Sequence, residues 1–178
     1  HLAIAEARKN LITMAGGPFG ACIVMALAIG SQTIAFWLKA LAIGSQTIAF
    51  WLKGKQVVVV AGNTVLSCND ATCHAEVNAI RRASKKLKDY YLSGCVLYST
   101  TESCPRCFSA IHWAKLDAVY FGTTINDVKK LGFDELRISC KKMKSTGRSK
   151  VKVVSGFLAK ECFELLEDWN KLENKQVY

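Results

Sequence analysis

Two short motifs constrain this chain most strongly: His74-Ala75-Glu76 and Cys104-Pro105-Arg106-Cys107. One imidazole and two thiolates fill three corners of a tetrahedral zinc site and leave the fourth for water, as in catalytic rather than structural zinc sites. Zinc lowers the pKa of bound water from about 15.7 towards about 7, so that hydroxide can attack an sp² carbon that carries an amino group. Glu76 need not bind the metal and is predicted to pass the proton to the ring nitrogen and the departing ammonia. Together the motifs predict hydrolytic deamination.

Each motif alone allows other interpretations. A lone Cys-x-x-Cys can be half of a structural zinc site or a redox pair. A structural site would need a fourth ligand, and the other histidines are His1 and His112. His112 lies five residues beyond Cys107 on the same predicted helix, where we expect a packing residue. Cys73 adjoins His74, but neighbouring side chains leave a helix about 100° apart, so a structural role is expected for Cys73 too.

Four longer stretches extend the pattern: Gly-Gly-Pro-Phe-Gly at 16–20, HAEVNAIRRA at 74–83, TESCPRCFSAIHWA at 101–114 and GFDE at 132–135. Together they resemble the cytidine deaminase-like superfamily, and within it the small bacterial guanine deaminases. The resemblance implies an α/β fold, specifically a three-layer α/β/α sandwich with a central five-stranded mixed sheet. It also implies Zn²⁺ bound at two helix N-termini and an obligate homodimer. One departure is Ser103, which stands where the family usually has proline.

The resemblance further assigns four residues to the substrate. Asn63 matches an asparagine that contacts purines, although a residue after Gly62 also fits a turn. Phe19 matches an aromatic residue that stacks on the base, and plain core packing is the alternative. Glu135 stands where guanine deaminases commonly have Asp, which is one methylene shorter, so the exact base stays open. Tyr178 matches a C-terminal aromatic residue that reaches over an active site, often the neighbouring subunit's after segment exchange; a frayed end is the alternative.

Hydrophobic periodicity predicts helices and strands in alternation. Helices are expected at 2–14, about 72–87, 104–115 and near the C-terminus, and strands at 19–25, 56–61, 95–100, 118–123 and 151–155. Such alternation predicts a largely parallel sheet with the site at the strand ends where helices begin. The polar stretch 141–152 is expected to be a loop. Pro105 suits the first position of the cysteine helix, and Ser103 or Cys104 can cap it.

The sequence ALAIGSQTIAFWLK occurs twice in tandem, at 26–39 and 40–53. With 178 residues, the chain is expected to be one zinc-dependent deaminase domain, 1–178, into which this repeat is inserted. The uncharged run 19–38 approaches the length that spans a bilayer, about 20 residues. It includes a predicted strand and is interrupted by polar residues, so membrane insertion is not expected. For the repeat we favour a short helical segment that exposes aromatic residues. A longer hairpin and a disordered loop are the alternatives.

The net charge of +10 suggests nucleic acid as a candidate partner. The basic residues concentrate at 81–88 and 141–152, and the second stretch has no aromatic residue for base stacking. The predicted C-terminal helix is acidic, which suits a phosphate backbone poorly. We therefore expect a solvated basic surface and no nucleic-acid site. The cysteines outside the zinc motif show no framework spacing, which is typical of a reducing cytoplasm.

These observations predict a cytoplasmic, zinc-dependent aminohydrolase that acts on a free nucleobase. Guanine is the favoured substrate, with xanthine and ammonia as products. Cytosine, a nucleoside, an aminotriazine and tRNA adenosine are the alternative substrates. A second class of function also stays open, in which the insertion has turned the scaffold into an inactive protein that binds a partner or a membrane.

Overall fold

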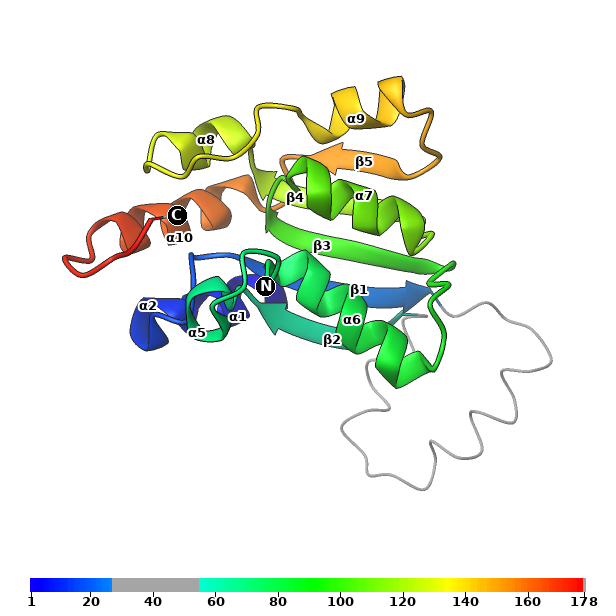
Figure 1. Cartoon of the computed structure of the whole chain (residues 1–178), viewed down its shortest axis with the longest axis horizontal. Coiled ribbons are helices and arrows are strands. Elements are labelled where there is room, and N and C mark those ends of the chain that lie inside the picture. The colour runs from blue at the N-terminus through cyan, green and yellow to red at the C-terminus, as the bar shows by residue number, and fades with distance from the viewer. Residues whose placement is uncertain (27–54, 178) are drawn as a thin grey trace.

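The computed structural model describes residues 1–26 and 55–177, which form a five-stranded sheet with helices on both faces (Figure 1). The strands are β1 (Gly20–Ala26), β2 (Lys55–Gly62), β3 (Cys95–Thr101), β4 (Ala118–Thr123) and β5 (Lys152–Ser155). Their order across the sheet is β2-β1-β3-β4-β5. The valine run of β2 and the aromatic residues of β4 suit a pleated, buried surface. The predicted α/β class is confirmed.

β1 runs in the opposite direction to both of its neighbours. It pairs antiparallel with β2 and β3, whereas β3, β4 and β5 are parallel. The prediction of a largely parallel sheet is therefore wrong at this strand, and the mixed sheet implied by the resemblance is confirmed. The register gives the reason. Ala26, the last residue of β1, pairs with Lys55, the first of β2. Consecutive strands that meet in this way pair antiparallel, because parallel pairing needs a crossover to the other end of the sheet.

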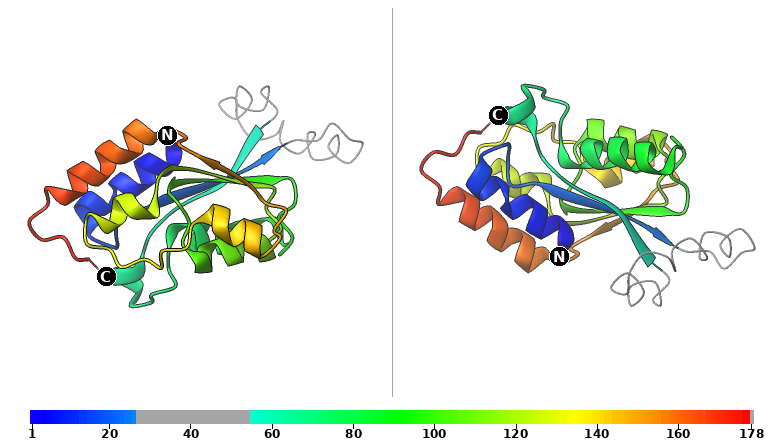
Figure 2. Two further views of the ribbon diagram at one scale, coloured as in Figure 1. Left: turned by 90° about the horizontal axis from the view of Figure 1, so that it is seen from above. Right: turned by 90° about the horizontal axis from the view of Figure 1, so that it is seen from below.

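Helices cover both faces, so the fold has three layers (Figure 2). One face carries α6 (Ala75–Leu87), α7 (Pro105–Trp113) and α9 (Cys140–Thr146). The other carries α1 (Leu2–Arg8) and α10 (Ala159–Asn170). Three shorter helices lie in the connections: α2 (Asn10–Thr13), α5 (Val65–Cys68) and α8 (Ile125–Lys129). The expected α/β/α sandwich is confirmed.

α6 approaches the sheet closely because its inner face is built from small residues. Ala75, Ala79 and Ala83 recur every four residues and have no exposed surface. This spacing places them on one side of the helix, where they pack in the same core as Ile23 and Leu97. The N-termini of α6 and α7 lie at the same end of the sheet (Figure 1). The site is therefore at the end where helices begin, as predicted.

α6 begins three residues later than the helix predicted at 72–87. Thr72 is held in a turn by Asp70, whose Oδ1 accepts hydrogen bonds from the amide and the hydroxyl of Thr72, each at 2.7 Å. Such Asx turns compete with helical hydrogen bonding. The helix therefore starts at Ala75, and the residue before it is left in an extended conformation.

Two further expectations differ from the structure. The helix predicted at 2–14 is divided into α1 and α2 around Lys9. The stretch 141–152 is not a loop throughout, because α9 occupies much of it. Ser139 starts this helix by accepting a hydrogen bond from the Lys142 amide at 3.2 Å, a capping interaction that offsets the polar composition.

The predictions made for the tandem repeat concern residues outside the described part of the chain, apart from Ala26. This holds for the helical segment, the hairpin and the disordered loop alike. Among the helices that the structure describes, none has the length and apolar character needed to cross a membrane.

Candidate metal centre and active site

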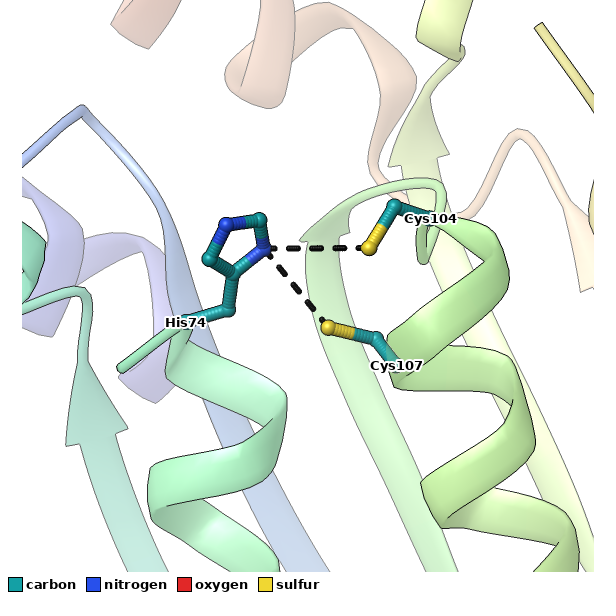
Figure 3. Close-up of side chains that lie close together, drawn as sticks. All are labelled: His74, Cys104 and Cys107. Atoms are coloured by element: carbon teal, nitrogen blue, oxygen red, sulfur yellow. Dashed lines mark hydrogen bonds between the residues drawn. The ribbon is translucent and has the colours of Figure 1, made fainter. Parts of the chain in front are cut away.

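α6 presents His74 directly before its first turn. His74 is the N-cap residue, with φ −66° and ψ 153°, and its side chain makes no capping hydrogen bond. The segment around it is fixed by Asn78, whose Nδ2 donates to Gly62 O at 3.0 Å, Thr64 Oγ1 at 3.0 Å and Cys73 O at 3.1 Å. These bonds tie the start of α6 to the loop after β2. The imidazole is thereby directed toward α7 (Figure 3).

α7 carries both cysteines of the second motif one turn apart. Cys104 is its N-cap residue in an extended conformation, and Pro105 occupies the first helical position, where the missing amide hydrogen costs nothing. Cys104 makes no side-chain capping bond, which leaves its sulfur for the metal. Cys107 is fully buried. Ser103 is also buried and is not the cap, so of the two predicted capping candidates only Cys104 occupies the N-cap position.

The three side chains converge from two helices (Figure 3). His74 Nδ1 lies 3.9 Å from Cys104 Sγ and 3.6 Å from Cys107 Sγ. Ligands bonded to one tetrahedral zinc at about 2.0 Å for nitrogen and 2.3 Å for sulfur lie about 3.5 Å from each other. The three donors therefore fit zinc with little movement. In the parts of the chain that the structure describes, this is the one group of His, Cys, Asp and Glu side chains arranged to hold a metal.

The pKa values of the two cysteine thiols shift in opposite directions. A hydrogen bond from Cys107 lowers the pKa of Cys104 to about 4 although burial opposes ionisation. The same hydrogen bond, together with burial, raises the pKa of Cys107. A thiolate is the form that binds zinc, so the lowered pKa of Cys104 favours metal binding and the raised pKa of Cys107 opposes it.

Cys73 and His112 do not join this cluster. The Cys73 thiol donates to Asp70 Oδ2 at 3.3 Å. His112 Nδ1 lies 2.9 Å from Ser149 Oγ, near the C-terminal end of α7. Both residues have the structural contacts that were expected of them.

Glu76 lies beside the metal ligands in a secluded position. It follows His74 in the first turn of α6, is 5% exposed and lines the same hollow as His74 and Cys104. Burial raises the pKa of its carboxyl, while the charge of His74 opposes the rise. A buried carboxyl group beside a metal site is placed to accept and return a proton.

A second wall of the hollow, beside the metal ligands, includes Phe19, Glu102, Val128 and Glu135. Phe19 is 9% exposed and packs edge-on against Phe133, with ring centroids 5.0 Å apart. It therefore lines the hollow and also packs in the core. Its stacking on a base stays a prediction. The hollow encloses about 20 Å³, roughly the room needed for one water molecule. A planar base can enter only if lining side chains move.

Glu135 approaches the metal ligands from the connection between α8 and α9. Its Oε1 lies 4.0 Å from His74 Nδ1. Burial, with the negative charge of Cys104 as the next cause, raises the pKa of Glu135 to about 7. The structure thus brings this carboxyl group to the site, as the sequence led us to expect.

Asn63 lies at the end of β2, fully buried. Its Oδ1 accepts a hydrogen bond from the Val65 amide at 3.0 Å, which is the turn contact anticipated as an alternative. Its Nδ2 is buried and has no hydrogen-bond partner among the described residues. The Asn63 backbone amide donates to the Phe19 carbonyl at 3.0 Å, but Asn63 is not among the residues that line the hollow. Tyr178 falls outside the described residues.

Glu102 is a site residue that the sequence did not single out. It lines the hollow, and its two carboxylate oxygens accept hydrogen bonds from Cys140 N at 2.9 Å and Ile125 N at 3.3 Å. These amides begin α9 and α8, the two helices that flank the connection carrying Glu135. One carboxylate therefore joins the start of α8 to the start of α9, and the connection with Glu135 runs between these two points. An acidic residue two positions before a ligand cysteine was the available signal, but its partners are 23 and 38 residues away.

Comparisons with known proteins agree with this geometry. Residues 42–123 match the family described as cytidine and deoxycytidylate deaminase zinc-binding region. Guanine deaminase of Bacillus subtilis is 37% identical over 120 residues, which cover 67% of this chain and 59% of that protein. The tRNA-specific adenosine deaminase of Buchnera aphidicola is 30% identical over 118 residues, which cover 66% of this chain and 74% of that protein.

Solved structures agree on the fold. A guanine deaminase from Nitrosomonas europaea superimposes with a TM-score of 0.72 at 23% identity, over 96% of this chain and 81% of that one. At this identity the likeness concerns the fold alone. The chain spans less than two thirds of the Bacillus relative, at 59% of its length.

Proposed function

Because the chain belongs to the zinc-binding family of cytidine and deoxycytidylate deaminases, we propose that it catalyses the hydrolytic deamination of guanine to xanthine and ammonia. The observation that carries this proposal is the triad of His74, Cys104 and Cys107 with the buried Glu76 carboxyl in the same hollow. A closed structural zinc site would need a fourth protein ligand, and none is present among the described residues.

The chain supplies the proton transfers through Glu76. When bound, zinc makes hydroxide available from water near neutral pH. Glu76 takes the proton that water gives up and delivers it to the ring nitrogen beside the amino-bearing carbon. It then takes the second proton, from the hydroxyl group that has been added to this carbon, and delivers it to the amino group, which leaves as ammonia while the hydroxyl oxygen becomes the carbonyl oxygen of xanthine. The burial of Glu76 keeps bulk water away from this exchange. One carboxyl group therefore acts as base and then as acid.

We assign recognition of the base to four residues outside the metal-ligand triad: Phe19, Asn63, Glu135 and Tyr178. Glu135 accepts hydrogen bonds from the N–H groups on the amidine edge of guanine. Asn63 offers its unpartnered Nδ2 to a ring acceptor, and Phe19 covers one face of the ring. Tyr178 is proposed to close the site from the C-terminal segment. These roles are the ones that a polar-edged purine requires.

Guanine is favoured over other bases by the Bacillus relative, which is named a guanine deaminase. One alternative also has a specific observation behind it, because the Buchnera relative is named a tRNA-specific adenosine deaminase. The two substrates differ sharply in size. A free base can be enclosed by Glu135 and Phe19, whereas a tRNA base must reach the metal while attached to its chain.

Assembly, location and organisation are further parts of the proposal. We infer a homodimer in which the C-terminal segments are exchanged, acting in the cytoplasm. All eight cysteines lie in the described residues and are unpaired, which supports a reducing compartment. We also infer that the tandem repeat at 26–53 is accessory to a single deaminase domain, because Ala26 and Lys55 are already paired across the β1–β2 ladder.

Ammonia release by the purified, zinc-loaded protein tests the proposal. Guanine, cytosine, adenine, guanosine and a tRNA anticodon stem-loop should be compared at equal concentrations, with inosine measured for the last. Guanine should be turned over well ahead of the others. Inosine formation without guanine turnover would move the assignment to tRNA. No product from any of them, despite one bound zinc per chain, would indicate an inactive scaffold.

A further inference from the structure

A second hollow lies at the end of the sheet opposite the metal ligands. It encloses about 590 Å³, within the range of small-molecule sites, about 300–1,000 Å³. Its walls come from the segments that follow α6, α7 and α9, near the starts of β3, β4 and β5 (Figure 1). Six lining residues matter here: Tyr91, His112, Lys115, Asp117, Arg148 and Lys150.

Hydrogen bonds join these three segments into one structure. Leu92 N donates to Ala114 O at 2.8 Å and so fixes the segment after α6 against the end of α7. His112 Nδ1 lies 2.9 Å from Ser149 Oγ, which fixes the segment after α9 against the same helix. The hollow is therefore built by the fold, and its walls do not depend on a single loop.

The wall carries more positive than negative charge. Lys115, Arg148 and Lys150 are exposed, and no carboxylate among the described residues forms an ion pair with them. Asp117 is the acidic residue of the wall, and its Oδ1 accepts a hydrogen bond from the Gly94 amide at 3.1 Å. The ends of α7 and α9 add roughly half a negative charge each. Three full cations leave a positive surplus, which suits an anion.

Aromatic rings lie beside these cations. Tyr91, on the wall, is 51% exposed, and Trp113 at the end of α7 is 74% exposed. Lys115 Nζ lies 5.7 Å from the centre of the Trp113 ring, so cation and ring already face each other. The stretch 141–152 contains no aromatic residue, but the fold brings Tyr91 to Arg148 and Lys150. The sequence-based argument against a phosphate ligand therefore does not apply at this hollow.

We propose that this hollow binds a nucleoside phosphate, with the phosphate on Arg148, Lys150 and Lys115 and the base against Tyr91. Cations that hold phosphate and an exposed ring that stacks on a base are the two features that nucleotide sites combine. The metal centre shares no lining residue with this hollow, so the site is separate from the one that turns over the substrate.

Calorimetric titration of the full chain with GMP at low salt tests the proposal. The charge-reversed double variant Arg148→Glu with Lys150→Glu should weaken GMP binding at least tenfold. The neutral variant Arg148→Gln with Lys150→Gln should give a smaller loss of GMP affinity. It provides a second measurement if the charge-reversed variant does not fold. The matched control, Lys141→Glu with Lys142→Glu, makes the same charge change on the exposed side of α9 and should leave the affinity within about twofold. Melting curves of all variants should overlay that of the parent.

Ligand variation separates a nucleotide from a simple anion. Tyr91→Ala should weaken GMP severalfold and leave inorganic phosphate unaffected, and guanosine should not bind at this hollow. The proposal is wrong if GMP binds the charge-reversed variant as tightly as the parent, or if inorganic phosphate matches GMP. Binding of a single-stranded RNA octamer without binding of GMP would also overturn it. None of these outcomes depends on deaminase activity.

Discussion

The two walls of the catalytic hollow are built in different ways. The metal wall consists of residues at the N-termini of α6 and α7, where extended N-cap residues and a proline at the first helical position fix His74 and Cys104 locally. The second wall, with Phe19, Glu102 and Glu135, is assembled from distant segments, and Glu102 joins the starts of α8 and α9, between which the connection with Glu135 runs. The metal wall is therefore set largely by residues that lie close to the ligands in the sequence. The second wall carries the residues to which we assign the choice of substrate.

Removing one metal ligand should have the largest effect. Cys107→Ala leaves two protein ligands, so bound zinc should fall well below one per chain and ammonia release should fall to background. Elemental analysis and the ammonia assay measure both. Cys95→Ala is the matched control, because Cys95 is equally buried but begins β3 at the far end of the sheet. If the Cys107 variant kept full zinc, the metal wall would be assigned wrongly.

A change in the second wall should lower turnover without lowering the zinc content. Glu135→Ala should lower kcat/KM for guanine by about 10²-fold or more, because a buried polar edge of the base loses its partner. Zinc content should stay at the parent level. Asp134→Ala, one position earlier and exposed, is the control. Equal activity of the Glu135 variant and the parent would remove Glu135 from substrate recognition.

Glu102→Gln should give a smaller and different effect. The glutamine side chain keeps one acceptor oxygen but loses the negative charge to which both backbone amides donate. The free energy of unfolding should therefore fall by about 1–2 kcal/mol. The connection bearing Glu135 should loosen, raising KM for guanine severalfold with kcat and zinc content little changed. Glu164→Gln on the exposed side of α10 controls for the loss of a carboxylate. An equal fall in kcat with KM unchanged would contradict a positioning role.

Deletion of the tandem repeat should have the smallest effect. Replacing residues 26–53 by Asn-Gly, a favoured hairpin turn, should leave a cooperative melt and the parent's zinc content. The β1–β2 pairing from Gly20–Gly62 onward remains to hold the strands. Thermal unfolding and elemental analysis provide the measurement. A protein without a cooperative transition would show that the repeat contributes to the core.

The contrast between the walls also explains how far the sequence could predict the structure. The metal-ligand cluster could be predicted because each motif places its ligands within one helical turn, at the N-terminus of a helix. The direction of β1 could not be predicted from the alternation of helices and strands. It depends on which ends of β1 and β2 meet in the fold, and here the end of β1 meets the start of β2. Glu102 was missed because its partners, Ile125 and Cys140, approach it only in the folded chain.

The second hollow illustrates the same limit. The cations of 141–152 and the ring of Tyr91 are about 50 residues or more apart in the sequence, and their proximity follows from the parallel order of β3, β4 and β5. Linear arguments about charge and aromatic content could not detect it. The helix α9 was missed for a related reason, since its capping residue outweighs its polar composition.

The most direct test of the account is the Glu76→Gln variant, measured for bound zinc and for ammonia release from guanine in the same preparation. Glutamine keeps the size of the side chain but cannot exchange the proton. The account predicts one zinc per chain, as in the parent, with turnover lowered by about 10²-fold or more. Loss of zinc together with activity, or turnover equal to the parent's with zinc in place, would contradict the assignment of Glu76 as the proton carrier beside the metal.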